Sequence, residues 1–348
     1  MTSARPIRTA VLGFGLSGRV FHAPFLACDP AYSLDVVVTR DEERAAQARA
    51  AHPKVTVLPD AATVFDRADE LDLVVVATPP ATHVELTAQA LDAGLHVVVD
   101  KPFTPTSAQG AALVERARRA GRLLTVFHNR RWDGDFRTLR RLVADGELGQ
   151  VHTFESRFET WKPHGPRAWK AHTPVSQGGG IVFDLGAHLI DQAVQLFGPV
   201  ESVWADVAVR TPHSSGVVDD DALVVLKHRN GVRSQLVLSS LAALPGPRFH
   251  VLGSSAAYTT WGLDPQEAAL RQGALPTDEG FGRVPREQWG VLGVGDDVRR
   301  VEPEPGDYGE FYRLLARAVH GEGTVPVDPG DAVAVVELVE RVHDAARR

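Results

Sequence analysis

Short apolar runs alternate with amphipathic helical stretches over the first third of the chain. The apolar run 71–77, LDLVVVA, is typical of a strand buried on both faces of a parallel sheet. Strands are predicted at 8–12, 34–39, 55–58, 71–77, 96–99 and 123–127, and helices from 19, at 41–51, 61–68, 81–93 and 107–120. This alternation predicts right-handed βαβ crossovers and a doubly wound, Rossmann-type α/β sheet.

The pattern changes in the second two-thirds of the chain. Candidate strands follow one another at 151–159, 200–211, 221–228, 233–241, 249–253 and 256–261, with helices at 180–197, 308–320 and 331–347. This order predicts an α+β domain with an open, largely antiparallel sheet. We therefore expect a first domain at 1–127 and a second at 128–348, whose last helices pack back on the first domain. The stretch 273–304, rich in Gly, Pro and charge, is left without an assigned element.

A glycine-rich hexapeptide links the first strand to the first helix. Its residues are Gly13, Phe14, Gly15, Leu16, Ser17 and Gly18. Strand, G-x-G-x-x-G and helix in this order form the dinucleotide fingerprint, in which the glycines allow a tight turn and close approach of a pyrophosphate. The phosphates would lie at the positive end of the helix. An ordinary glycine turn is the alternative.

In a doubly wound sheet the ligand lies beyond the carboxyl ends of the strands, so residues that follow the strands are candidates for binding. Lys101, held by a following proline, is a candidate for a tuned ammonium group, because a lysine, unlike an arginine, can lose its charge. A surface lysine at a turn is the alternative. The candidates are Thr39, Arg40, Arg44, Thr78, Pro79, His83, Asp100, Lys101, Arg130 and Asp133.

Arg40 stands where NAD-preferring domains have an acidic residue, about 20 residues beyond the glycines. A guanidinium there can pair with a 2′-phosphate, and Thr39 and Arg44 can assist it. The expected cofactor is therefore NADP, with NAD used more weakly. Two alternatives stay open: Asp41 could contact the ribose in another register, or Arg40 could be solvated.

A second group of polar residues lies in the stretch GGGIVFDLGAHLID. Asp184 and His188 are spaced i, i+4 on a predicted helix, so both side chains can reach one point. A carboxylate beside an imidazole suits proton transfer to or from an alcohol. An intrahelical Asp–His pair is the alternative. We expect no metal, because His164 and His172 are only loosely placed as further ligands.

The composition limits the class of protein. The formal net charge of −7 argues against a general nucleic-acid or anionic-membrane surface. Cys28 is the single cysteine, so an intrachain disulfide is impossible. No apolar run reaches the length of a membrane span, and the first residues lack the apolar core of a signal peptide. We expect a cytoplasmic protein.

Several of these motifs together resemble the Gfo/Idh/MocA oxidoreductases. The resemblance rests on the glycine fingerprint, on Asp100-Lys101-Pro102 and on the helix with Asp184 and His188. The segments GFGLSGRVFHAP, FHNRRWDGDF, FDLGAHLIDQ and GLDPQE are similar, more narrowly, to the NADP-dependent scyllo-inositol dehydrogenases of that family. Asp100 stands where most of the family has Glu, and the family pattern implies a cis peptide before Pro102.

The resemblance implies a mechanism for interconverting a cyclitol hydroxyl and its ketone. His188 would act as general base and acid, Lys101 would stabilise the developing alkoxide, and Asp184 would orient the substrate or His188. Asp100 would fix Lys101 or the cofactor. The hydride chemistry itself belongs to the nicotinamide.

A polyol needs hydrogen-bonding side chains and aromatic walls. Besides Asp184 and His188, the favoured candidates are Arg130, Asp133, Arg167 and Trp169. A tryptophan in the core and solvated arginines are the alternatives. The alternative functions are an aldose or keto-sugar dehydrogenase and a non-catalytic dinucleotide- or sugar-binding regulator. Because the second sheet has too few helices to cover both faces, we also expect a homodimer or homotetramer.

Overall fold

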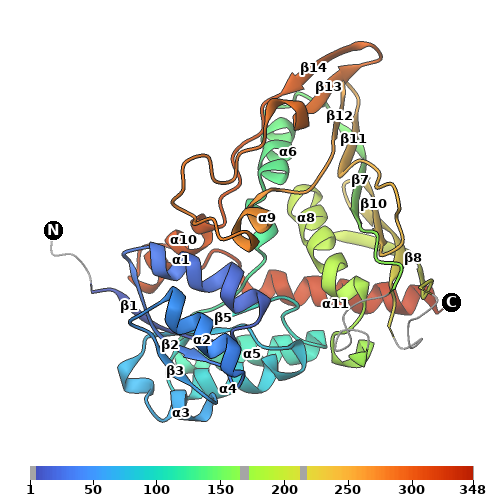
Figure 1. Ribbon diagram of the computed structural model, residues 1–348. Coiled ribbons are helices and arrows are strands. Elements are labelled where there is room, and N and C mark those ends of the chain that lie inside the picture. Colours follow the sequence, from blue (N-terminus) through green and yellow to red (C-terminus); the bar gives the residue numbers. More distant parts are fainter. Residues whose placement is uncertain (1–4, 165–171, 212–217, 348) are drawn as a thin grey trace. The chain divides into compact units, whose positions relative to one another are not determined.

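The computed structural model describes residues 5–164, 172–211 and 218–347 (Figure 1). The chain forms two compact units. The first contains Met1–Asn129, Gln266–Phe281 and Asp307–Val333, and the second contains Arg130–Pro265, Gly282–Gly306 and Ala334–Arg348. The first unit thus extends two residues beyond the expected boundary at 127, and two later segments join it.

The first unit is built on a parallel six-stranded sheet with the order β3-β2-β1-β4-β5-β6. This order confirms the doubly wound fold, whose switch point lies between β1 and β4. All four residues of β4 are buried, as its continuous apolar sequence predicts. The strands are β1 (Ile7–Leu12), β2 (Tyr32–Val38), β3 (Thr56–Leu58), β4 (Leu73–Val76), β5 (His96–Val99) and β6 (Leu124–Val126).

Two helices of this unit, α2 and α5, begin at residues whose side chains cap them. The carboxylate of Asp41 accepts the amide of Arg44 at the start of α2, and Thr106 and Gln109 form a reciprocal capping box for α5. Gly121 ends α5 with a left-handed backbone. The helical segments are η1 (Ser17–His22), α1 (Ala23–Cys28), α2 (Glu42–Ala51), α3 (Ala62–Phe65), η2 (Ala68–Glu70), η3 (Pro80–Thr82), α4 (His83–Asp92), α5 (Ser107–Ala120), α9 (Gln266–Arg271) and α10 (Gly309–Val319).

An aromatic cluster explains why α10, far along the chain, belongs to the first unit. The Tyr32 hydroxyl donates to the carbonyl of Tyr312 at 2.6 Å, and Nδ1 of His22 lies 2.6 Å from the Tyr312 hydroxyl. Phe25 stacks on Tyr312, and Phe127 lies against His22. All five side chains are buried, so this cluster holds η1, α1 and α10 together around one core.

The second unit is built on an eight-stranded sheet with the order β14-β13-β12-β11-β7-β10-β9-β8. Only the central β7–β10 pair is parallel, which confirms a largely antiparallel sheet. The strands are β7 (Val151–Glu159), β8 (Val200–Ala208), β9 (Asp221–His228), β10 (Arg233–Ser239), β11 (Phe249–Gly253), β12 (Ala257–Thr260), β13 (Gly290–Val294) and β14 (Asp297–Val301). The helical segments are α6 (Gly134–Ala144), η5 (Val175–Gln177), η6 (Val182–Gly186), α8 (Ala187–Phe197) and η7 (Arg286–Gln288). Two segments cross the division, η4 (Asn129–Trp132) and α11 (Pro329–Ala346).

The unassigned stretch 273–304 contains the β13–β14 hairpin. Gly295, at a φ of +57°, stands in the two-residue connection, where such turns need positive φ values. β14 is exposed at four of its five positions and carries Asp297, Arg299 and Arg300. A solvated edge strand of this kind lacks the apolar alternation by which sequence patterns identify strands.

Burial of His22 makes the folded state sensitive to acid. Desolvation lowers the pKa of His22 to about 4 from 6.5, although the charge of Asp100 opposes the shift. Below pH 6.5 the unfolded chain therefore takes up a proton that the folded chain does not bind until about pH 4. Stability falls as the pH drops through this window, by roughly 3 kcal/mol at most for this residue.

We predict that His22→Gln flattens the pH dependence of the unfolding free energy between pH 6.5 and 4.5, by about 2 kcal/mol. Urea titrations at several pH values measure this slope. His320→Gln, which alters an exposed histidine, is the control and should leave the slope unchanged. Equal slopes for His22→Gln and the unmodified protein would contradict the prediction.

Candidate functional site

The glycine turn of the first unit has the geometry that its fingerprint predicts. A Cβ atom at Gly13, where φ is +95°, would lie 2.7 Å from the carbonyl oxygen of Ala77, and one at Gly18 would lie 2.0 Å from that of Gly13. At Gly15 the nearest atom is Nη1 of Arg44, 3.9 Å away. The first and third glycines are therefore required by packing, while the second faces open space through which a ligand can approach.

The residues between the glycines divide into core and site. Phe14 is buried and packs edge-on against His52, so it belongs to the core. Leu16 is exposed. Ser17 begins η1, and its buried hydroxyl has no hydrogen-bond partner among the described residues. An orphaned hydroxyl at the helix start, beside the open glycine, fits a pyrophosphate oxygen.

The loop after β2 places the basic residues around the start of α2. Asp41 caps this helix, and its backbone amide donates to the Thr39 hydroxyl at 3.3 Å. Arg44 lies 3.6 Å from the Asp41 carboxylate, with its guanidinium above Gly15. Arg40 is exposed, and the pKa of Asp60 is lowered by hydrogen bonds from Thr63 and further by the charge of Arg40. Asp41 therefore caps α2, Arg44 lies near Gly15, and Arg40 is exposed beside Asp60.

The loops after β4 and β5 carry the other candidates of the first unit. The Lys101–Pro102 peptide bond is cis, which confirms the expected isomer. The carboxylate of Asp100 accepts the backbone amide of Lys101 at 2.8 Å. Thr78 lies against the position a Gly13 side chain would take, and Pro79 follows it before η3. His83 is fully buried, with both ring nitrogens on backbone carbonyls.

In the second unit, Asp184 and His188 lie on one continuous helical segment, as predicted. Its first part, η6, is a π-helix whose i→i+5 bonds widen the turn that bears Asp184. His188 lies on α8, and its side chain is buried. Such π-turns often occur at functional sites. The sequence predicts the helix but not its widened first turn.

Asp219 fixes the start of this helical segment. One carboxylate oxygen accepts the amide of Val182 at 2.9 Å, and the other lies 3.4 Å from Nε2 of His343. A Cβ at Gly180, where φ is +96°, would lie only 2.2 Å from that second oxygen. The sequence analysis did not single out Asp219. Its signal is the run Asp219-Asp220-Asp221 at the start of β9, three carboxylates that an apolar strand does not need.

The two arginines at the start of the second unit are each paired with a carboxylate of the same unit. Arg130 donates to Asp133 at 3.2 Å, both are buried, and the guanidinium stacks on Phe158. Arg131 makes a bidentate pair with Asp191 of α8, with a shortest distance of 2.6 Å. Arg131 and Asp191 were missed by the sequence analysis, since the pairing joins residues 60 positions apart. Arg167 and Trp169 lie outside the described residues.

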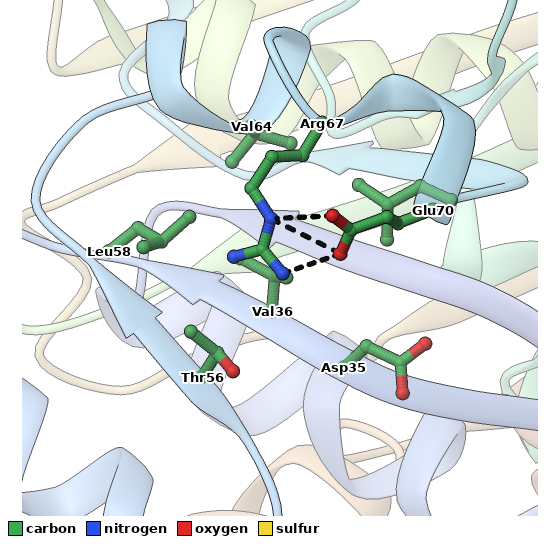
Figure 2. A pocket seen from close by; sticks show the side chains of 8 residues that line it. Asp35, Val36, Thr56, Leu58, Val64, Arg67 and Glu70 are labelled. Atoms are coloured by element: carbon green, nitrogen blue, oxygen red, sulfur yellow. Dashed lines mark hydrogen bonds and ion pairs between the residues drawn. The ribbon is translucent and has the colours of Figure 1, made fainter.

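A cavity of about 100 Å³ lies in the first unit, away from the glycine turn (Figure 2). Its walls come from β2, β3 and the α3–η2 segment, and Figure 2 shows the Arg67 guanidinium directed at Glu70. No residue of the fingerprint lines it. The cavity is therefore separate from the glycine turn that forms the candidate dinucleotide site.

The described residues contain neither a metal-binding cluster nor a membrane-spanning helix. No group of three or more His, Cys, Asp or Glu side chains there is arranged to hold a metal ion. Within the same residues, no helix combines the length and apolar character needed to cross a membrane.

Comparison with known proteins agrees with the two units. Residues 7–128 match the model of the oxidoreductase family with an NAD-binding Rossmann fold, and 136–259 match the GFO/IDH/MocA C-terminal domain. The oxidoreductase YdgJ of Escherichia coli is 38% identical, over 98% of this chain and 96% of its own. The NADP(+) scyllo-inositol 2-dehydrogenase IolW of Bacillus subtilis is 30% identical, over 98% and 94%. A solved oxidoreductase structure from Yersinia pestis is 38% identical and superposes with a TM-score of 0.91 over 99% of this chain and 96% of that one.

The chain therefore belongs to the GFO/IDH/MocA family of oxidoreductases, and its first unit is an NAD-binding Rossmann domain.

We predict that Gly180→Ala destabilises the protein more than Gly231→Ala does. Both positions have positive φ values, which cost an alanine about 1–2 kcal/mol, but only at Gly180 does the methyl group displace a carboxylate. Gly231, with open space around it, is the matched control. The unfolding free energy should fall by at least about 1 kcal/mol more for Gly180→Ala, and equal losses would contradict the role assigned to Asp219.

Proposed function

We propose that this chain interconverts a cyclitol hydroxyl, as in scyllo-inositol, and its ketone by hydride transfer with NADP(H). The observation that carries the proposal is full-length similarity to a scyllo-inositol 2-dehydrogenase, together with Lys101, Asp184 and His188 in the family's motifs. A regulator that only binds a sugar or a dinucleotide does not need these three groups together.

Each proposed catalytic group is fixed within its own unit. Lys101 follows β5, and Asp100 holds its backbone. There the ammonium group would stabilise the developing alkoxide. His188 would take the hydroxyl proton during oxidation and return it during reduction, and Asp184 would orient the substrate or His188. Arg130 and Asp133 are proposed to contribute to polyol recognition, as are Arg167 and Trp169.

The proposed cofactor is NADP, with weaker use of NAD. When bound, the nicotinamide supplies the hydride acceptor or donor. The Gly13–Gly18 turn, Thr39, Thr78, Pro79 and Asp100 would hold the dinucleotide, with Arg40 and Arg44 at a 2′-phosphate. The capping role of Asp41 supports this choice, because one oxygen of its carboxylate already accepts the Arg44 amide at the start of α2.

The same proposal includes a homodimer or homotetramer. Residues of β9 alternate between buried and accessible positions, and those of β10 largely do, so one face of this part of the second sheet is covered. On the other, Trp204, Leu223 and Val225 lie in neighbouring strands, with Trp204 paired to Val225, and Trp204 is 55% exposed. Exposed aromatic and aliphatic side chains on adjacent strands favour burial against a second copy of the chain.

The experiment that tests the function is a substrate screen. The purified protein is offered inositol isomers and common aldoses with NADP⁺ or NAD⁺, and nucleotide reduction is followed by absorbance. Oxidation of a cyclitol with the highest kcat/KM supports the proposal. A clear preference for an aldose would mean that the substrate is a sugar and not a cyclitol. The absence of turnover with every polyol and sugar would favour a non-catalytic binding regulator.

We predict that Lys101→Ala and His188→Ala each reduce kcat by at least about 100-fold, since each removes a group that handles the reacting proton or alkoxide. Binding of NADP⁺, measured by fluorescence titration, should survive. Lys227→Ala, which removes an exposed lysine paired with Glu201, is the control and should retain full turnover. Near-normal kcat in both variants would refute the assigned roles.

We predict that kcat/KM favours NADP⁺ over NAD⁺ by at least about tenfold, the scale of a charge-assisted contact to a phosphate. Arg40→Asp should abolish or reverse that preference by placing a carboxylate beside the 2′ position. Arg49→Asp introduces the same charge change at the far end of α2 and should leave the ratio unchanged. Equal or better use of NAD⁺ by the unmodified protein would contradict the assignment.

A further inference from the structure

His83 connects two loops of the first unit through its imidazole ring. It is the first residue of α4 and is fully buried. Its Nδ1 lies 2.8 Å from the carbonyl oxygen of Pro102, and its Nε2 lies 2.9 Å from the carbonyl oxygen of Thr78. Both contacts have hydrogen-bond length and use backbone atoms, so the ring spans the loop after β4 and the loop after β5.

These two loops carry different parts of the proposed reaction. Pro102 directly follows Lys101, across the cis peptide bond. Thr78 follows Ala77, whose carbonyl oxygen would lie 2.7 Å from a Cβ at Gly13, in the glycine turn. The imidazole therefore couples the backbone that bears the lysine to the backbone that borders the dinucleotide turn.

The carbonyl oxygens of Pro102 and Thr78 accept hydrogen bonds and cannot donate them, so the ring N–H is the donor. A neutral imidazole has one N–H and donates to one of the two carbonyls, while its other nitrogen lies in contact with the second. Within the same loop, the Asp100 carboxylate accepts the backbone amide of Lys101 at 2.8 Å. Residues 100–102 are thus held both by Asp100 and by His83, which restricts where the Lys101 side chain begins. Small displacements of a reacting group cost large factors in rate.

We propose that His83 is a positioning residue for Lys101, acting through the Pro102 carbonyl, rather than a contact to the cofactor. This inference rests on the proposed function. Both ring nitrogens are taken up by backbone carbonyls and the side chain is fully buried, so nothing in the geometry requires contact with a dinucleotide. The role is distinct from that of Lys101, because the imidazole touches neither substrate nor cofactor.

The test uses the full-length protein, its best polyol substrate and NADP⁺. His83→Leu fills the space without a donor, and His83→Gln restores an amide donor. His228→Leu is the matched control: His228 is also fully buried, with Nδ1 2.8 Å from the carbonyl of Gly198 and Nε2 2.8 Å from the hydroxyl of Ser234, but it lies in β9 of the second unit. Melting temperatures identify losses of stability common to both leucine variants.

We expect His83→Leu to lower kcat by about 10- to 100-fold, with the KM for NADP⁺ changed less than about threefold, and His83→Gln to recover most of the loss. His228→Leu should lower the melting temperature but keep kcat. In a Lys101→Ala background, His83→Leu should cost less than about threefold further, because the group it positions is gone.

Three results would overturn the inference. One is a raised KM for NADP⁺ with kcat unchanged, which would make His83 a cofactor contact. Another is a full additional loss of kcat in the Lys101→Ala background, and the third is an equal loss of kcat in His228→Leu. If Lys101→Ala itself keeps normal turnover, the role proposed for Lys101 and this inference both fail, whereas the absence of any polyol turnover by the unmodified protein would refute the proposed function. A loss in Lys101→Ala without a loss in His83→Leu removes the inference alone.

Discussion

The close approach of backbone to backbone at Gly13 and Gly18 is the constraint on which the first unit depends. A methyl group at either position would lie within 2.7 Å of a carbonyl oxygen, so β1 can pass directly into η1 only if both side chains are absent. This passage brings the helix start to the carboxyl end of β1, next to the switch point with β4. Thr78 lies beside Gly13, and its carbonyl oxygen contacts the His83 ring. The same ring contacts the carbonyl oxygen of Pro102, next to Lys101. The glycine turn and the loop that bears the proposed catalytic lysine are therefore connected through contacts within one unit.

Much of this arrangement could be predicted from the sequence because its determinants are local. The apolar run of β4, the glycine turn and the capping residues of α2 and α5 act within a few positions, and each specifies the element that the structure contains. The cis bond at Lys101–Pro102 was expected from the resemblance alone. The solvated hairpin strand β14 was missed because its stability comes from pairing with β13 rather than from an apolar face.

The residues that sequence patterns could not identify act over long distances. Asp219 and Val182 are 37 positions apart, Arg131 and Asp191 are 60, and His22 and Tyr312 are 290. No local periodicity encodes such pairs. The buried charges among them also contradict the usual preference for an apolar core, and a lone member would be strongly destabilising without its partner. Arg131 and Asp191 instead join the FHNRRWD segment to α8 by a bidentate contact that only one register satisfies.

The two units solve the same problem of positioning in different ways. In the first, Lys101 stands on a short loop whose backbone contacts the Asp100 carboxylate and the fully buried His83 imidazole. In the second, Asp184 and His188 stand on a helical segment whose first turn is widened and whose start is fixed by Asp219 against a glycine that has no room for a side chain. In both cases the supporting residue bonds to the backbone rather than to the functional side chain. Contacts of this kind fix where each side chain begins. Substitutions at the supporting residues should therefore change the rate of the reaction without an equal change in the binding of substrate or cofactor.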